Sequence, residues 1–226
     1  MTLSIIIPVL DEAANIEAAL RTLAPLRARG VEVIVADGGS RDGTPELARP
    51  LADRVIGAPR GRATQMNAGA AIARGDVLLF LHADTQLSDD ADRLVLDGLA
   101  RTGHAWGRFD VRFDGGGLAL VASMMNLRSR LSGIATGDQA MFVTRAAFEV
   151  AGGFPPIALM EDIALSARLK RIGRPLCLAA RITTSARRWR RHGILRTILL
   201  MWRLRFAYFF GVDPIHLAKA YGYGER

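Results

Sequence analysis

Acidic side chains follow three short apolar segments in the first half of the chain. The segments and the groups after them are Leu3–Val9 with Asp11 and Glu12, residues 31–36 with Asp37, and residues 77–81 with His82 and Asp84. Asp37 begins a glycine-rich loop, and an ionised carboxylate there can accept hydrogen bonds from a base N–H or a ribose hydroxyl. We interpret Asp37 as a ligand contact, whereas Asp42 and Thr44 could equally cap the next helix.

Asp84 could hold a divalent cation. Mg²⁺ and Mn²⁺ prefer oxygen ligands and keep several waters, so one carboxylate can hold such an ion against a diphosphate. His82 could add a nitrogen ligand, which Mn²⁺ tolerates better than Mg²⁺, or it could be a hydrogen-bonding neighbour of the site. The sequence therefore predicts an Mg²⁺ or Mn²⁺ site at Asp84, with His82 as an open second ligand.

Arg60 and Arg62 stand where a helix is expected to begin. Guanidinium groups and the free N–H groups of a helix N-terminus both favour phosphate, so this segment predicts an anion site; a solvated helix start is the alternative. Asn67 lies in the middle of the same helix, where asparagine is a poor helix former and indicates another purpose.

The paired carboxylates Glu161 and Asp162 precede a helical pattern of apolar residues. One of them could act as the general base that deprotonates an acceptor hydroxyl. Equally, the pair could cap the helix and complement its dipole. Spacing alone favours neither interpretation.

The elements that must position these groups alternate along the chain. Continuous apolar strands are typical of a buried parallel sheet, and a weaker strand is expected at residues 54–56. Helical patterns occupy residues 13–29, 44–52 and 62–74, so the order predicts a doubly wound, mostly parallel α/β sheet. Ligands bind beyond the carboxyl ends of such strands, where the acidic side chains lie.

The second half of the chain is less regular. Strands are expected at residues 106–113, 139–143 and 175–182, and helices at residues 118–131, 144–151, 162–172 and 194–210. We predict one domain over residues 1–191, with a nucleotide-binding half (1–85) and an acceptor half (86–191). Residues 192–226 form a helical tail, either part of the same domain or peripheral to it.

Several protein classes are disfavoured by what the sequence lacks. The glycine-rich loop is neither the dinucleotide fingerprint nor a P-loop with its lysine. A single cysteine, Cys177, excludes an internal disulfide and a multi-cysteine zinc cluster. The N-terminus does not resemble a signal peptide, and no uncharged apolar stretch reaches 18 residues. We therefore expect a cytoplasmic protein.

Taken in order, these motifs resemble the family 2 glycosyltransferases with the GT-A fold. The resemblance rests on Pro8 to Glu12, Asp37-Gly-Gly-Ser-x-Asp-Gly-Thr44, Gly61-Arg62 with Gln65 and Asn67-x-Gly69, Phe80-Leu-His-Ala-Asp-Thr85, and Glu161-Asp162. It covers residues 3 to about 191 and is strongest to a compact bacterial subgroup with the strand end F-L-H-A-D-T. It implies transfer of a sugar from a nucleotide-sugar donor, most often a UDP-sugar, to a hydroxyl, usually with inversion.

The resemblance also implies roles for individual residues. The nucleoside contacts would be Pro8, Asp11 or Glu12, Asp37 and Ser40, and the contacts near the diphosphate and sugar would be Arg62 and Asn67. Asp84 would take the place of the last Asp in the family's Asp-x-Asp metal motif, whose first carboxylate is replaced here by His82.

On the acceptor side, the resemblance makes Asp162 the catalytic base, with Glu161 beside it. The segment Ser185 to Trp189 is similar to the Q-x-x-R-W element of processive members, but the glutamine is absent, which argues against processive polymer synthesis. Arg188 or Arg187 could still bind the leaving diphosphate.

All of the formal charge of +8 comes from residues 181–226, which hold ten basic and two acidic side chains. A helix over residues 194–210 would be apolar around most of its circumference. It could pack on the domain, on a second subunit in a homo-oligomer, or on the inner leaflet of a membrane that supplies a lipid acceptor. Nucleic acid is an unlikely partner, because the aromatic and apolar content suits packing better.

Two other functions compete with glycosyl transfer. A nucleotidyltransferase would share the α/β layout, but residues 10–15 contain neither the glycine nor the lysine of its usual loop. The non-enzymatic alternative is an Arg-rich module that binds nucleic acid or an anionic membrane.

Overall fold

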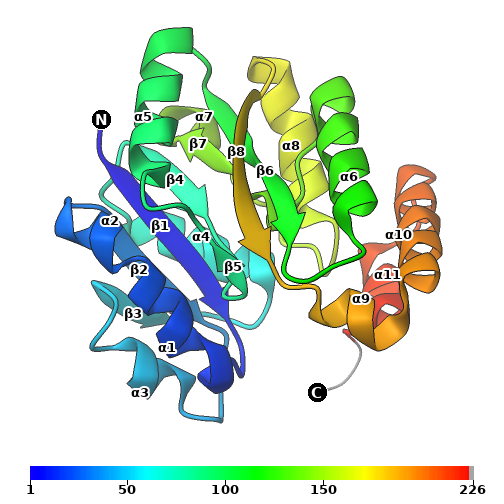
Figure 1. Cartoon of the computed structure of the whole chain (residues 1–226), viewed down its shortest axis with the longest axis horizontal. Helices are drawn as coiled ribbons and strands as arrows, with labels where there is room; N and C mark the ends of the chain where they lie inside the picture. Colours follow the sequence, from blue (N-terminus) through cyan, green and yellow to red (C-terminus); the bar gives the residue numbers. More distant parts are fainter. Residues whose placement is uncertain (224–226) are drawn as a thin grey trace.

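In residues 1–223, the part of the chain that the structure describes, eight strands form one sheet with helices on both faces (Figure 1). The structure is a computed structural model. The strand order is β3-β2-β1-β4-β7-β6-β8-β5. The last three residues of the predicted tail, 224–226, lie outside the described part.

The first half is the expected parallel unit. Its strands are β1 (Leu3–Val9), β2 (Glu32–Asp37), β3 (Arg54–Gly57) and β4 (Val77–Phe80), and its helices are α1 (Ala13–Thr22), α2 (Ala24–Ala28), α3 (Thr44–Ala48) and α4 (Arg62–Ile72). Ile5, Ile6 and Ile7 are consecutive and fully buried, because helices cover both faces of β1. The carboxyl ends of β1, β2 and β4 therefore meet at one edge of the sheet.

The helix predicted over residues 13–29 is two helices. Pro25 lies in the first turn of α2, where its missing N–H costs nothing, and the chain breaks at Leu23 between α1 and α2. The helix expected over residues 44–52 ends early, at Ala48.

The second half contains β5 (Thr85–Gln86), β6 (Trp106–Phe113), β7 (Phe142–Thr144) and β8 (Leu176–Thr184). β7 runs antiparallel to β4 and β6. The strand expected over residues 139–143 is displaced, because Gln139 ends a short 3₁₀ turn closed by Thr136 and Ala140 has a φ of 43°. The sequence analysis did not predict α5 (Ala91–Thr102), whose Val95 and Leu99 are buried on the sheet.

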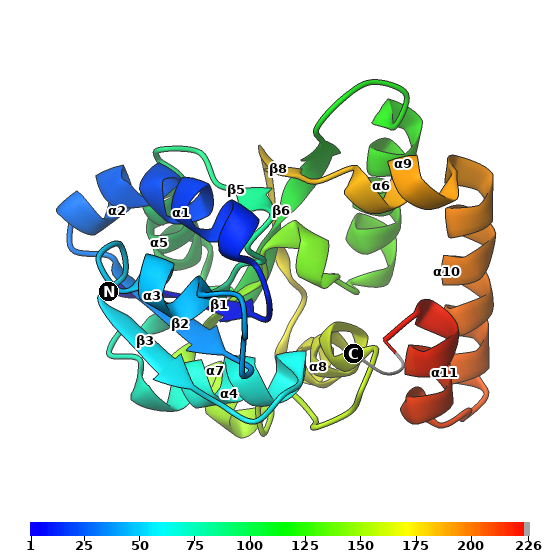
Figure 2. The ribbon, with the colours of Figure 1, turned by 90° about the horizontal axis from the view of Figure 1, so that it is seen from below.

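The remaining helices are α6 (Ala119–Ser132), α7 (Arg145–Val150), α8 (Glu161–Ile172), α9 (Arg187–His192), α10 (Ile194–Phe209) and α11 (Pro214–Tyr221). The helix predicted over 194–210 thus forms, and one face of it packs on the domain. Leu204 of α10 and Leu217 of α11 share a buried cluster with Leu159 and Met160, directly before α8 (Figure 2). Among residues 1–223, no helix is long and apolar enough to cross a membrane.

Candidate active site

The loops after β1 and β2 are joined by hydrogen bonds around Asp37. Its buried carboxylate accepts from the backbone N–H of Gly39 at 2.9 Å and of Ser40 at 3.0 Å, and the Ser40 hydroxyl also donates to it. The Ser40 Oγ accepts from the N–H of Asp11, and the Arg41 N–H donates to the Asp11 carboxylate, both at 2.9 Å. The structure therefore brings together Asp11, Asp37 and Ser40, as the sequence analysis expected of a common site.

Asp42 and Thr44, whose roles were open, connect the same two loops. The N–H of Ala13 donates to Asp42 and the N–H of Glu12 donates to the Thr44 hydroxyl, each at 2.9 Å. The hydrogen bond from the Thr44 hydroxyl, followed by that from Ala13, lowers the pKa of Asp42. Glu12 also lies 3.7 Å from the guanidinium of Arg187, so the start of α9 reaches the nucleotide half.

Gln65 was part of the recognised motif but was not among the predicted site residues. It is buried in α4, and its Nε2 donates to the carbonyl oxygens of Val9 at 2.6 Å and Ala36 at 2.8 Å. It therefore holds α4 against the ends of β1 and β2, next to Pro8, which pairs with Ala36 in the sheet. A glutamine within an otherwise apolar helix face is the signal that could have revealed it.

Asn67 positions the loop that closes the site from the other side. Its Nδ2 donates to the carbonyl oxygen of Phe154 at 2.8 Å, and its Oδ1 accepts from the N–H of Phe154 at 3.0 Å. This pairing accounts for an asparagine in the middle of a helix. Both ends of its amide are engaged, so direct contact with a diphosphate would require this pairing to open.

Two of the predicted anion-binding arginines, Arg62 and Arg188, lie against the C-terminal end of the described chain. The guanidinium of Arg188 lies 3.5 Å from the ring centroid of Tyr221 and donates to its carbonyl oxygen at 2.8 Å. That of Arg62 lies 5.4 Å from the ring centroid of Tyr223, and the two tyrosine rings are 4.9 Å apart. Neither tyrosine could be predicted from the sequence, because nothing local indicates that α11 returns to the site.

The candidate metal site consists of Asp84 and its neighbours. Within residues 1–223, the Asp84 carboxylate has only a 3.5 Å contact with the Thr85 hydroxyl, and no three His, Cys, Asp or Glu side chains form a metal-binding group. The Nδ1 of His82 lies 3.5 Å from the carboxylate of Asp138. Burial by itself would raise the pKa of Asp138, but the interaction with His82 and the charges of Arg62 and Arg205 together outweigh it and lower that pKa. The Asp84 carboxylate, which has so few contacts of its own, fits an ion that is held mainly by substrate phosphates and waters.

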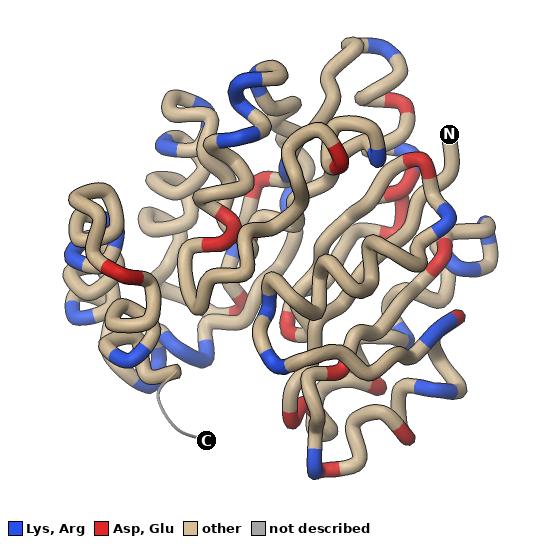
Figure 3. The backbone as a smooth tube through the Cα atoms, turned by 180° about the vertical axis from the view of Figure 1, so that it is seen from behind, with Lys and Arg blue, Asp and Glu red and all other residues tan. Residues whose placement is uncertain are grey.

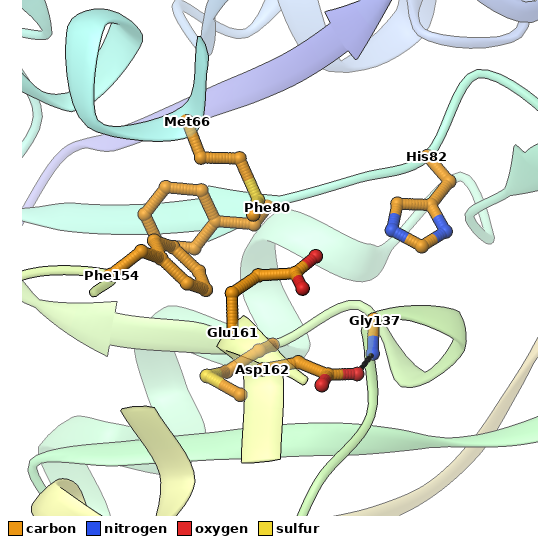
Figure 4. A pocket seen from close by; sticks show the side chains of 8 residues that line it. Met66, Phe80, His82, Gly137, Phe154, Glu161 and Asp162 are labelled. Carbon is orange, nitrogen blue, oxygen red and sulfur yellow. Dashed lines mark hydrogen bonds between the residues drawn. The ribbon is translucent and has the colours of Figure 1, made fainter. Parts of the chain in front are cut away.

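Glu161 and Asp162 begin α8 and differ in their surroundings (Figure 4). The Asp162 carboxylate accepts from the N–H of Gly137 at 2.8 Å and from that of Ile163 at 2.7 Å, which fixes its orientation. The Glu161 side chain is only 6% exposed. Burial, reinforced by the charge of Asp162, raises the pKa of Glu161 to about 7.

A narrow cavity joins the end of β4 to the start of α8. Its lining residues are Met66, Phe80, His82, Gly137, Met141, Phe154, Glu161 and Asp162. A Cβ at Gly137 would come within 2.5 Å of the His82 ring, so only glycine permits this approach. The structure thus brings His82 next to the two carboxylates, although 78 residues separate it from Glu161 in the sequence.

The model of the family described as "Glycosyl transferase family 2" matches residues 4–152 of the chain. The protein belongs to glycosyltransferase family 2. Among curated proteins, it is similar to the succinoglycan biosynthesis protein ExoA of Rhizobium meliloti, with 41% identity over 111 residues that cover 42% of this chain and 32% of ExoA. It is also similar to a PGL/p-HBAD biosynthesis glycosyltransferase of Mycobacterium tuberculosis, with 39% identity over 99 residues that cover 41% of this chain and 38% of that protein. The matched part is thus about a third of the length of these relatives.

Solved structures confirm the predicted GT-A-type α/β fold. This family 2 chain superposes on Staphylococcus aureus TarS 1–349 with a TM-score of 0.69 and 18% identity, covering 82% of this chain and 61% of that one. The mannosyltransferase PcManGT of Pyrobaculum calidifontis, solved with GDP-Man and Mn²⁺, has a TM-score of 0.66 and 21% identity, covering 91% and 60%. At this identity the likeness establishes the fold alone.

Proposed function

We propose that the protein transfers a sugar from a nucleotide-sugar donor, in the first instance a UDP-sugar, to a hydroxyl acceptor with inversion. The observation that carries the proposal is the cavity in which His82, at the end of β4, meets Glu161 and Asp162 of α8. The cavity lies between the strand ends, where a nucleotide would bind, and the two carboxylates, one of which could deprotonate an acceptor hydroxyl. Residues 1–85 would then bind the donor and residues 86–191 would face the acceptor.

In the proposed reaction, the acceptor oxygen attacks the anomeric carbon as the bond from that carbon to the diphosphate oxygen breaks. The hydroxyl proton passes to Asp162, which the N–H of Gly137 holds in place. Arg62 and Arg188 neutralise the charge that develops on the leaving diphosphate. Asp84, with His82 as a second ligand, would hold an Mg²⁺ or Mn²⁺ ion that supplies further positive charge there.

Asp37→Ala tests the donor half of the proposal. We expect calorimetry with UDP and Mn²⁺ to show binding to the wild type, and the variant to lose about tenfold or more in affinity, since a hydrogen bond to a charged group contributes roughly 1.5–3 kcal/mol. Asp97→Ala, on the exposed face of α5, is the matched control and should bind normally. Unchanged affinity in Asp37→Ala would remove Asp37 from the site. Stabilisation of the wild type by an oligonucleotide alone, or by UTP in preference to UDP, would overturn the transferase proposal.

We also propose that one face of the protein rests on an anionic membrane, at the inner leaflet of the cell membrane. Neighbouring helices α6 and α10 each expose an apolar stripe at helical spacing, made of Leu120, Met124, Leu127 and Leu131 on α6 and of Leu195, Leu199, Trp202, Phe206 and Phe209 on α10. Figure 3 shows Lys and Arg gathered on the C-terminal helices. Exposed aromatic and aliphatic side chains beside basic ones favour binding to anionic lipid.

Flotation with vesicles tests this surface. We expect the wild type to float with phosphatidylcholine–phosphatidylglycerol vesicles at low salt and much less with phosphatidylcholine alone. Replacing Trp202, Phe206 and Phe209 by serine should abolish flotation, whereas Val150→Ser, an exposed apolar site on α7, should not change it. The alternative is a subunit interface. It would be identified if the wild type binds no vesicles and sediments as a dimer, while the triple variant sediments as a monomer.

A further inference from the structure

The guanidinium of Arg128, on α6, has two donor atoms that nothing among residues 1–223 satisfies. Its Nε and Nη2 are buried and have no hydrogen-bond partner. Arg108 also has a buried Nε without a partner, but its charge and that of Arg130 are paired with the carboxylate of Asp110. A buried charged donor without a partner is costly, and in a native protein it usually indicates a water or an ion that completes the site.

Arg205 of α10 reaches the same region from a second helix. Leu204, directly before it, and Ala207, two residues after it, pack in the cluster that contains Met160 and Ile163, which flank Glu161 and Asp162. Among residues 1–223, Arg205 has no hydrogen bond and no ion pair within 4 Å. Burial lowers its pKa, and the charges of Asp162 and Asp138 partly offset this. The fold therefore places a second partly desolvated arginine within range of the charges of these two carboxylates.

The two arginines repel one another. Burial, followed by the charge of Arg205, lowers the pKa of Arg128 to about 10, and the charge of Asp162 opposes this only in part. Stability does not explain why charged side chains occupy this region, because the protein would be at least as stable with apolar side chains in the same space. The charge of Asp162 acts on both arginines, whereas that of Asp138 acts on Arg205, so Arg128 is the less compensated of the two cations and an incoming anion would satisfy its free donors.

This charge lies on the acceptor side of the base. Arg128 and Arg205 project from α6 and α10, which lie across α8 from the β1–β3 half that carries Asp37 (Figure 2). They are also distinct from Arg62 and Arg188, whose guanidinium groups lie against Tyr223 and Tyr221. In the proposed function Arg62 and Arg188 bind the donor diphosphate, so we assign an anion at Arg128 and Arg205 to the other substrate.

We propose that Arg128 and Arg205 bind a phosphate group of the acceptor, close to the hydroxyl that Asp162 deprotonates. The proposal deepens the proposed function and rests on Asp162 as its base. A phosphate presents several oxygens at once and can accept from two separate guanidinium groups, whereas neutral sugar hydroxyls would supply no negative charge to them. The phosphate is not consumed in the transfer; it orients the acceptor.

Phosphate titrations of the protein saturated with UDP and Mg²⁺ test the proposal. Inorganic phosphate and glycerol 3-phosphate are the soluble probes, and calorimetry measures their binding. We expect Arg128→Gln and Arg205→Gln to weaken phosphate binding by at least about tenfold, with UDP affinity unchanged. Arg171→Gln, on the exposed last turn of α8, is the matched control and should bind phosphate as the wild type does.

Thermal unfolding provides a second readout that does not depend on activity. Phosphate should raise the Tm of the wild type but not that of Arg128→Met, which should itself be at least as stable as the wild type without phosphate, because an unpaired charge is gone. Equal phosphate binding by wild type and both glutamine variants would overturn the proposal. Failure of UDP to bind the wild type would instead count against the proposed function, while the phosphate titration is still interpretable by itself.

A second flotation experiment distinguishes a lipid headgroup from a soluble acceptor as the source of the phosphate. It uses phosphatidylcholine vesicles that contain phosphatidic acid. If Arg128→Gln reduces this flotation while the soluble probes bind only weakly, the phosphate belongs to a lipid headgroup. If the soluble probes bind in an Arg128-dependent manner and flotation is unaffected, it belongs to a soluble acceptor; dependence on Arg128 in neither arm refutes the site.

Discussion

Asp162→Asn is expected to reduce sugar transfer by about 10²–10⁴-fold, the usual contribution of a general base, while leaving UDP affinity unchanged. Asparagine keeps an oxygen that can accept from the N–H of Gly137, so the start of α8 should retain its geometry. It cannot take up the acceptor proton. The loss should therefore appear in kcat.

Initial rates of UDP release and calorimetry with UDP, on the same preparations, measure the two effects. Asp89→Asn, on an exposed turn before α5, is the matched control and should retain both properties. If Asp162→Asn turns over at a rate comparable to that of the wild type, Asp162 is not the catalytic base. A parallel loss of UDP affinity would move Asp162 to the donor side of the site.

Glu161→Gln is expected to stabilise the protein above neutral pH. Burial raises the folded-state pKa of Glu161 to about 7, from an ordinary value of 4.5. Between these values the unfolded chain releases the proton while the folded protein keeps it, so this carboxyl makes the free energy of unfolding fall as pH rises. Above pH 7 the penalty is complete, of the order of 3 kcal/mol, and glutamine avoids it because it never ionises.

Urea unfolding from pH 4 to pH 8 measures this difference. The two proteins should be about equally stable at pH 4, and the variant should gain progressively up to about pH 7. Glu149→Gln, on the exposed end of α7, should show no such pH-dependent gain. In an Asp162→Asn background the gain should be smaller, because the charge that adds to the effect of burial is gone. A gain independent of pH would contradict the assignment.

Much of the fold follows from local patterns. β1 and β6 have the predicted bounds, Leu3–Val9 and Trp106–Phe113. The pattern of apolar and polar side chains along consecutive residues indicates both the length of a strand and its burial. Asp37 at the end of β2 was placed at the ligand edge for the same reason: parallel strands present their carboxyl ends together. The single helix predicted over residues 13–29 was too long. Pro25 lies in the first turn of α2, and the chain breaks between α1 and α2 at Leu23.

The sequence by itself determined the family, the parallel half of the sheet and the positions of the chemical groups along the chain, since each of these depends on neighbours in sequence. The tertiary structure alone decided which groups meet. Asn67 pairs with Phe154, and Arg188 pairs with Tyr221. The charge of Asp162 acts on Arg128 of α6 and Arg205 of α10, two helices that no local pattern connects. The physical reason is that long-range contacts depend on how helices pack and on which charged groups are buried away from water. Neither can be predicted from the spacing of residues along the sequence.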